Sequence, residues 1–225
     1  MNILIVTATS PEIEPLVKKM GQGPELLQNL TRYTLKTTKI DVLVTGVGMV
    51  ATTYWTGKIL SKFQYDLAIN VGICGSFNHE YPLGTVVNVV NDRFPETGAE
   101  SGEYFLSLID LKLLEVDEFP FQEGLLVNNY DFSNEPWKRL PRVAGVTVNT
   151  VHGNDKSIAK FRERIKAEIE TMEGAAFFFS CFHENVRCIQ LRAISNYVSL
   201  RDTSKWNIPL AIYNVNQVLL NFLNE

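Results

Sequence analysis

The sequence has 225 residues, of which 45% are hydrophobic and 20% are charged, and its formal net charge is −4 at pH 7. A chain of this length and apolar content can bury a large core, and its negative charge argues against nucleic acid or an anionic membrane surface as the main partner. Three cysteines without a C-x-x-C pair are neither a disulfide framework nor a zinc site. The N-terminus lacks the basic region of a signal peptide, and no uncharged apolar run approaches the roughly 20 residues of a membrane span. We therefore expect one cytoplasmic domain over residues 1–225.

Short apolar runs alternate with segments of helical spacing along the whole chain. The runs predict strands over residues 2–6, 32–37, 40–45, 67–71, 85–91, 143–150, 168–171 and 187–195. The helical spacing predicts helices over residues 11–20, 49–63, 155–166, 173–183 and 209–223. Alternation of this kind, without a repeat or a linker, predicts an α/β fold, a three-layer sandwich in which helices cover both faces of a mixed central sheet.

Two local features refine these boundaries. Ser10 is the expected N-cap of the first helix, with Pro11 at the first helical position. Residues 92–141 form the least regular stretch, and there we expect a strand near residues 124–127 and loop elsewhere, covering a site or a subunit contact.

The glycine-rich turn after the strand over residues 40–45 fits the dinucleotide fingerprint G-x-G-x-x-A, through Gly46, Gly48 and Ala51. The fingerprint also needs an acidic residue at the end of the next strand, and that place holds Asn70 or Gly72. We therefore favour a turn that brings a helix close to the sheet over an NAD site. No cofactor and no metal are expected.

Cys74 lies in a second glycine-rich turn and is a candidate nucleophile, with His79 or His152 as its base. A free cysteine is more often a small buried hydrophobic residue, and nothing nearby in the sequence indicates a lowered thiol pKa. We favour the structural role.

Polar side chains gather where predicted strands end. Glu12 and Glu173 both lie in a first helical turn after a strand, where the helix dipole favours their charge. Arg192, Ser195 and Asn196 stand at the end of the strand over residues 187–195. Because ligands of open α/β sheets bind at the carboxyl ends of strands, we expect one common pocket.

Five motifs in order make the sequence resemble the nucleoside phosphorylase/nucleosidase family over nearly its whole length. They are Ala8…Glu12-Ile13, Thr45-Gly46-Val47-Gly48, Asn70-Val71-Gly72-Ile73-Cys74-Gly75, Met172-Glu173-Gly174-Ala175 and Arg192-Ala193-Ile194-Ser195-Asn196. The resemblance implies a phosphorylase/hydrolase-like fold, a purine nucleoside as ligand and a homodimer or larger homo-oligomer.

The resemblance also implies roles for single residues. Glu173 would bind the ribose hydroxyls with Met172 packed on the sugar, and Glu12 would deprotonate the attacking water. Ser76 and Arg192 would lie near that water. Ser195 and Asn196 would face the purine.

Two departures from the family pattern narrow the substrate. Adenosine-type nucleosidases carry an aspartate where this chain has Asn196, and an asparagine can donate to a 6-keto oxygen and accept from N7–H. Phosphorylases carry an arginine where this chain has Asn70, and without it a phosphate dianion has little to hold it. The resemblance therefore implies hydrolysis of a 6-oxopurine nucleoside.

The stretch from Ser195 to Trp206 resembles the futalosine hydrolases, which release hypoxanthine from futalosine in the alternative route to menaquinone. In that case Arg201 would pair with the carboxylate of the 5′ substituent and Trp206 would contact its ring. Arg201 is equally well explained as a solvated charge in a loop, and Trp206 as an aromatic residue of the core.

Several alternatives remain open at this stage. They are a 6-oxopurine nucleoside phosphorylase, a methylthioadenosine/S-adenosylhomocysteine-type nucleosidase, which Asn196 disfavours, and an inactive nucleoside-binding or oligomerisation module. The presence of both Glu12 and Glu173 argues against the inactive module, because a binder has no use for a water-activating base.

Overall fold

The computed structural model describes residues 1–130 and 136–224. Residues 131–135, which belong to the stretch predicted as irregular, and residue 225 lie outside that part. The helices are α1 (Ser10–Met20), α2 (Met49–Leu60), α3 (Asp155–Arg164), α4 (Gly174–His183) and α5 (Ile208–Asn224), with short 3₁₀ helices at Pro136–Arg139 and Thr203–Lys205. Among the described residues, no helix combines the length and the apolar character that a membrane crossing requires.

The strands build one large mixed sheet and one small hairpin. In chain order they are β1 (Asn2–Thr7), β2 (Glu25–Leu27), β3 (Leu30–Leu35), β4 (Thr38–Val44), β5 (Leu67–Ser76), β6 (Val86–Asp92), β7 (Gly98–Ser101), β8 (Tyr104–Ser107), β9 (Leu126–Val127), β10 (Arg142–Thr147), β11 (Ile169–Thr171) and β12 (Cys188–Tyr197). The large sheet runs in the order β11-β10-β6-β12-β5-β1-β4-β3-β2, and β7 pairs with β8 separately.

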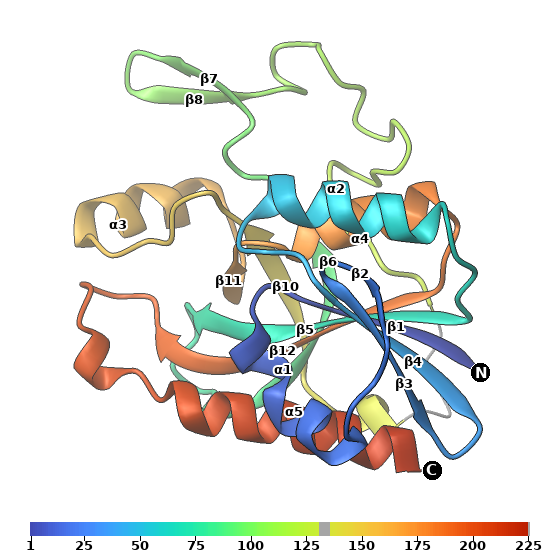
Figure 1. The fold of residues 1–225 in the computed structure, drawn as a ribbon. Helices are drawn as coiled ribbons and strands as arrows, with labels where there is room; N and C mark the ends of the chain where they lie inside the picture. Colours follow the sequence, from blue (N-terminus) through green and yellow to red (C-terminus); the bar gives the residue numbers. More distant parts are fainter. Residues whose placement is uncertain (131–135, 225) are drawn as a thin grey trace.

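The sheet lies between two layers of helices, α2 and α4 on one face and α1 and α5 on the other (Figure 1). The central strands β1 and β5 are buried on both faces, as the continuous apolar runs of their sequences require. The predicted three-layer α/β fold with a mixed central sheet is confirmed.

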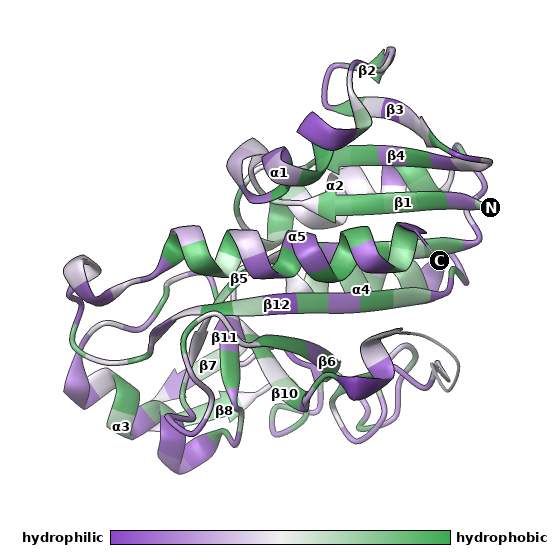
Figure 2. Ribbon diagram, turned by 90° about the horizontal axis from the view of Figure 1, so that it is seen from below, coloured by the Kyte–Doolittle hydropathy of each residue, from purple (hydrophilic) through white to green (hydrophobic). Residues whose placement is uncertain are grey.

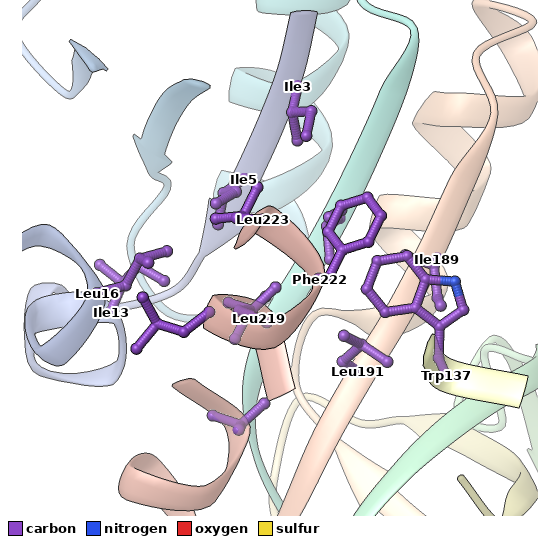
Figure 3. Packing of buried hydrophobic residues seen from close by; sticks show 14 of the residues in the cluster. Ile3, Ile5, Ile13, Leu16, Trp137, Ile189, Leu191, Leu219, Phe222 and Leu223 are labelled. Atoms are coloured by element: carbon purple, nitrogen blue, oxygen red, sulfur yellow. The ribbon is translucent and has the colours of Figure 1, made fainter. Parts of the chain in front are cut away.

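Alternate residues of each central strand pack into two different hydrophobic cores, one on each face of the sheet. Ile3 and Ile5 of β1 pack with Ile13 of α1 and Leu219 of α5, whereas Leu4 and Val6 belong to the core beneath α2 and α4. The first core also receives Phe222 and the fully buried Trp137, whose rings lie 4.0 Å apart between centroids (Figure 3). The outer face of α5 carries most of the hydrophilic positions of that amphipathic helix, and the buried Asn216 is an exception (Figure 2).

The strand β5 is longer than its apolar run. Its sequence predicts a strand only to residue 71, but the ladder continues through the glycine-rich residues 72–76, because β12 stays paired with β5 along that whole length. The far end of β5 also pairs antiparallel with β11, through Ile169 opposite Ser76 and Glu170 opposite Gly75. This second pairing closes a ring of strands β5-β12-β6-β10-β11 at the end where the site lies.

Several local predictions are wrong. Helix α1 begins at Ser10, and its N-cap is Thr9, which shares a capping box with Glu12. The stretch over residues 92–141 contains the hairpin β7–β8, which lacks the apolar pattern of a buried strand because most of its residues are exposed. The short strand β2 was not expected either, and it extends the sheet edge beyond β3.

Candidate active site

A cavity of about 440 Å³ opens at the carboxyl ends of the central strands. Its walls come from the starts of α1 and α4, the end of β5, the end of β12 and the two loops that follow β10 and β12. Seven predicted site residues line it: Glu12, Met172, Glu173, Ser195, Asn196, Arg201 and Trp206. The fold therefore brings together side chains that are up to 194 positions apart in the sequence.

Glu12 is held by donors on both of its carboxylate oxygens. Its Oε2 accepts from the backbone N–H of Thr9 at 3.0 Å and from the Thr9 hydroxyl at 2.9 Å, and its Oε1 accepts from the N–H of Ile73 at 3.1 Å. A Cβ on Gly72 would lie 2.7 Å from Oε1. Glycine at position 72 therefore leaves the room that this carboxylate occupies.

Glu173 faces Glu12 from the start of α4. Its Oε1 accepts from the backbone N–H of Gly48 at 3.0 Å, and its Oε2 lies 3.7 Å from Nη1 of Arg192. Burial raises the pKa of Glu173 above its usual value, the charge of Glu12 adds to that rise, and Arg192 and the Gly48 N–H oppose it. The two carboxylates are therefore close enough to influence each other's charge.

The first glycine-rich turn supports Glu173. Gly46 and Gly48 have φ angles of +88° and +98°, a region that side chains disfavour, and the resulting turn directs the Gly48 N–H at the carboxylate. The turn thus supplies a site donor, a role that the sequence pattern alone did not indicate.

Arg192 lies beneath the cavity and does not line it. The side chain is fully buried. Its Nε donates to the side-chain oxygen Oε1 of Gln190 at 3.2 Å, and its Nη2 donates to Oδ1 of Asn70. Asn70 also donates to the backbone carbonyl of Val6 at 3.0 Å. Arg192 therefore reaches the lining of the cavity through Glu173, its buried carboxylate partner.

Ser195 and Asn196 lie at a β-bulge. The register between β12 and β5 shifts between Ile194 and Asn196, so that Asn196 stands opposite Gly75. The Ser195 hydroxyl lies within bonding distance of the Cys74 carbonyl, at 3.1 Å, and of Asn196 Oδ1, at 2.8 Å. The Asn196 amide nitrogen donates to the Tyr197 backbone carbonyl at 3.3 Å, and when the Ser195 hydroxyl donates to Oδ1, the second hydrogen of that nitrogen is left to donate to a ligand.

The structure does not bring Ser76 to the cavity, which corrects its predicted placement. The residue is fully buried, and its hydroxyl donates to the backbone carbonyl of Asn78 at 2.8 Å and accepts from the Asn78 N–H at 3.1 Å. Because β11 pairs with β5 at this position, Ser76 is enclosed by the turn that follows β5.

Cys74 lines the cavity, but its thiol is unsuited to nucleophilic attack. Burial raises the pKa of Cys74 to about 12, so that the thiolate is scarce at neutral pH. This agrees with the structural role that the sequence favoured.

The cavity also contains a pair that sequence reasoning missed. His152 Nδ1 lies 2.6 Å from Oε2 of the buried Glu170, whose Oε1 accepts from the His152 backbone N–H at 3.1 Å. Glu170 and Asn196 both stand opposite Gly75, on the two strands that flank it. The available signal was a glutamate inside a predicted strand, three residues before Glu173.

Two loops meet at the mouth of the cavity. The backbone N–H of Arg201 donates to the Gly153 carbonyl at 3.1 Å, which joins the loop after β12 to the loop after β10. The Arg201 guanidinium lies 5.0 Å from the centroid of the Trp206 ring. The pair forms a wall that is both cationic and aromatic.

Comparison with known proteins assigns the family. Residues 2–224 match the model of the phosphorylase superfamily. The chain belongs to the phosphorylase superfamily. It is 29% identical to a futalosine hydrolase from Streptomyces coelicolor, over 94% of this chain and 91% of that protein. It is 22% identical to a 5′-methylthioadenosine/S-adenosylhomocysteine nucleosidase from Colwellia psychrerythraea, over 100% and 96%.

A solved structure from this superfamily has the same fold. The nucleosidase from Colwellia psychrerythraea 34H in complex with adenine superposes with a TM-score of 0.84 and 20% identity, covering 100% of this chain and 95% of that one. The predicted enzyme class, an N-glycosyl hydrolase, is confirmed, because the chain belongs to this superfamily and both relatives matched over nearly their whole length are nucleosidases.

Gly174→Ala is expected to destabilise this superfamily member by about 1–3 kcal/mol and to lower its activity. A Cβ on Gly174 would overlap both Gln190 Oε1 and Asp92 Oδ2, which are themselves buried. Gly57→Ala in α2 is the matched control, because a Cβ there meets nothing within 4 Å and alanine favours a helix. Thermal unfolding of the two variants measures the difference, and equal midpoints would contradict the expected overlap.

Proposed function

We propose that the protein is a futalosine hydrolase, which cleaves futalosine with water to hypoxanthine and dehypoxanthine futalosine in the alternative route to menaquinone. The observation that carries this assignment is Asn196, which lines a cavity that also contains Glu12 and Glu173. An asparagine donates to the 6-keto oxygen of hypoxanthine, whereas an aspartate suits the amine of adenine. The three cysteines are free and buried, which supports action in the cytoplasm.

The two carboxylates divide the chemistry. Glu12, fixed by Thr9 and Ile73, accepts a proton from water as the water oxygen bonds to C1′ of the ribose. Glu173 holds the ribose hydroxyls and stabilises the positive charge that develops on the sugar as the bond from C1′ to the base breaks. The base leaves with the bonding electron pair and is hydrogen-bonded at its oxygen by Asn196.

The positions of the arginine side chains favour water over phosphate as the nucleophile. Arg201 is the one arginine or lysine that lines the cavity among the described residues, and it lies at the mouth. Arg192 is fully buried, and its donors are directed to Gln190, Asn70 and Glu173. A phosphate dianion beside the sugar would therefore lack a free guanidinium.

The deciding experiment is product analysis with futalosine and with inosine, each with and without phosphate. Release of hypoxanthine that is independent of phosphate and much faster from futalosine is expected. Release from inosine only with phosphate would show a nucleoside phosphorylase. Turnover of methylthioadenosine in preference to both would show a methylthioadenosine-type nucleosidase.

Arg201→Gln is expected to raise KM for futalosine roughly tenfold or more, because the substrate carboxylate loses a charged partner. Inosine has no carboxylate, so its kcat/KM should change little. Lys205→Gln is the control, because Lys205 is exposed in the same loop, pairs with Asp202 and does not line the cavity. An equal effect of Arg201→Gln on both substrates would remove Arg201 from the recognition of the 5′ substituent.

We also infer a homodimer or larger homo-oligomer. Val47, Val50 and Tyr54 form an apolar strip along the start of α2, with 56%, 81% and 56% of each residue exposed. The strip reaches the cavity, because Val47 also lines it. Light scattering after size exclusion is expected to give at least twice the mass of the 25.4 kDa chain, and Val50→Lys is expected to shift it toward the monomer. A monomeric wild type would refute the oligomer.

A further inference from the structure

A chain of buried polar groups runs from Asp92, at the end of β6, to the carboxylate of Glu173. Asp92 Oδ2 accepts from Nε2 of Gln190 at 3.1 Å, and Gln190 Oε1 accepts from Nε of Arg192 at 3.2 Å. Arg192 Nη1 then lies 3.7 Å from Glu173 Oε2. Asp92, Gln190 and Arg192 have no solvent exposure, so none of them can exchange a partner for water without opening the core.

The second oxygen of Asp92 is occupied as well. Its Oδ1 accepts from the backbone N–H of Arg93 at 2.8 Å and from the Thr147 hydroxyl at 3.1 Å. The Thr147 oxygen in turn accepts from the N–H of Ala175, in the first turn of α4, at 2.7 Å. Both carboxylate oxygens are therefore committed, and the side chain is fixed in its orientation.

The direction of these hydrogen bonds follows from the chemistry of Arg192. A guanidinium only donates hydrogen bonds, so Gln190 must turn its side-chain carbonyl toward Arg192 and its NH₂ group toward Asp92. The reversed amide would place NH₂ against the guanidinium, donor against donor. A side chain at Gly174 would overlap Asp92 and Gln190, which shows how closely α4 packs over the pair.

We propose that Asp92 is a positioning residue for the sugar-binding carboxylate: through Gln190 it orients the Arg192 guanidinium against Glu173. Asp92 touches no substrate in this scheme. The inference rests on the proposed function in one respect, namely that Glu173 holds the ribose. Sequence reasoning gave Arg192 a role in the site but gave none to Asp92 or Gln190.

Exchanging the carboxylate and the amide between positions 92 and 190 tests this series of hydrogen bonds. In Asp92→Asn the new amide keeps one oxygen for Arg93 and Thr147 and places an NH₂ against Gln190, which must turn its own NH₂ toward Arg192. In the double variant Asp92→Asn/Gln190→Glu, the NH₂ of residue 92 donates to the carboxylate of residue 190, whose other oxygen accepts from Arg192 Nε. The double variant thus pairs every donor with an acceptor again, and it moves the negative charge from position 92 to position 190.

The substitutions are expected to affect the nucleoside, which contains the ribose, and not the free base. Asp92→Asn is expected to lower kcat/KM for the nucleoside roughly 10- to 100-fold, the effect of mispairing a buried hydrogen bond to a charged group. Hypoxanthine has no ribose, so its binding should change less than threefold. Gln190→Glu alone places two carboxylates together and should lose a similar factor, whereas the double variant should recover to within about fivefold of the wild type, as coupled neighbours do.

A second readout does not depend on turnover. The Nε–H resonance of Arg192, identified by its loss in Arg192→Lys, should move upfield in Asp92→Asn, where the acceptor is lost, and downfield again in the double variant, to the wild-type position or beyond it, because a carboxylate then accepts. If Asp92→Asn alone does not fold, a folded double variant with this downfield resonance is the expected rescue. Unchanged resonance and activity in Asp92→Asn, or a double variant no better than the single ones, would overturn the proposal. A wild type inactive on every nucleoside would refute the proposed function, while the resonance would still decide the orientation of Arg192.

Discussion

Glu12→Gln is expected to reduce kcat by roughly 10²- to 10⁴-fold, the usual contribution of a general base, while the KM for the nucleoside changes little. The amide matches the shape of the carboxylate but cannot accept the proton of the attacking water. In the proposed function the sugar and base contacts come from Glu173 and from the end of β12, whose own hydrogen bonds the substitution leaves in place. Steady-state kinetics with futalosine, together with the binding of hypoxanthine, measures both parts of this expectation.

The same variant separates catalysis from capping. Glu12 accepts from the N–H groups of both Thr9 and Ile73, and the single side-chain oxygen of a glutamine can keep only one of them, so an effect on stability is expected in addition to the effect on rate. Loss of one such hydrogen bond typically costs about 1 to 3 kcal/mol, whereas a 10³-fold fall in kcat corresponds to about 4 kcal/mol in the barrier. A correctly folded Glu12→Gln protein with little activity would therefore assign the loss to chemistry.

Glu14→Gln is the matched control for this prediction. Glu14 lies two residues further along the same helix, is exposed and pairs with Lys18 at 2.9 Å. Its replacement should leave kcat within about twofold, since exposed ion pairs contribute little. Turnover of Glu12→Gln within tenfold of the wild type would show that another group activates the water.

Periodicity in the sequence was sufficient to predict the layers of the fold. The two faces of β1 require apolar cover on both sides, and the helical spacing of residues 49–63 and 209–223 supplies it. The ring closed by β11 and β5 could not be predicted, because it depends on pairing between Glu170 and Gly75, which lie 95 positions apart. Its consequence is local and large, since Ser76 at the end of β5 is enclosed by the turn that follows, away from the cavity.

The residues of the candidate site could be predicted to lie together wherever the side chain stands at a strand end or a helix start. Glu12, Glu173 and Asn196 meet that condition. Two groups that support Glu173, one directly and one through Arg192, do not carry such a signal. The Gly48 donor is a backbone group, and the contribution of Gln190 depends on which end of its amide faces Arg192. Composition and spacing contain no information on either feature, because both are set by three-dimensional packing.

Asn196→Asp is expected to move the preference from 6-oxopurine toward 6-aminopurine nucleosides by roughly 10²-fold or more in the ratio of kcat/KM values. The amide nitrogen donates to a 6-keto oxygen, whereas an aspartate in its place offers an acceptor and suits the exocyclic amine. With futalosine, the carboxylate would face the keto oxygen, acceptor against acceptor, at a half-buried position. With the 6-amino counterpart of futalosine, the same carboxylate would find a donor.

The bulge at Ser195 makes this exchange informative. With its hydroxyl donating to Oδ1 of the residue at position 196, Ser195 fixes which oxygen or nitrogen meets the base, and a carboxylate can accept the same bond. Besides the group that faces the ligand, the exchange removes only the long bond from Nδ2 to the Tyr197 carbonyl, at 3.3 Å. Asn78→Asp is the control, because it adds the same charge outside the cavity and keeps the bond from the Glu80 N–H.

Competition between futalosine and its 6-amino counterpart in one reaction gives the ratio directly, without separate enzyme concentrations. An inverted preference in Asn196→Asp alone would assign base selection to this side chain. An unchanged ratio would transfer that role to the other polar groups at this end of the cavity, the His152–Glu170 pair opposite Gly75. Since Glu170 is committed to His152, the residue to replace next would be His152, by glutamine and by asparagine.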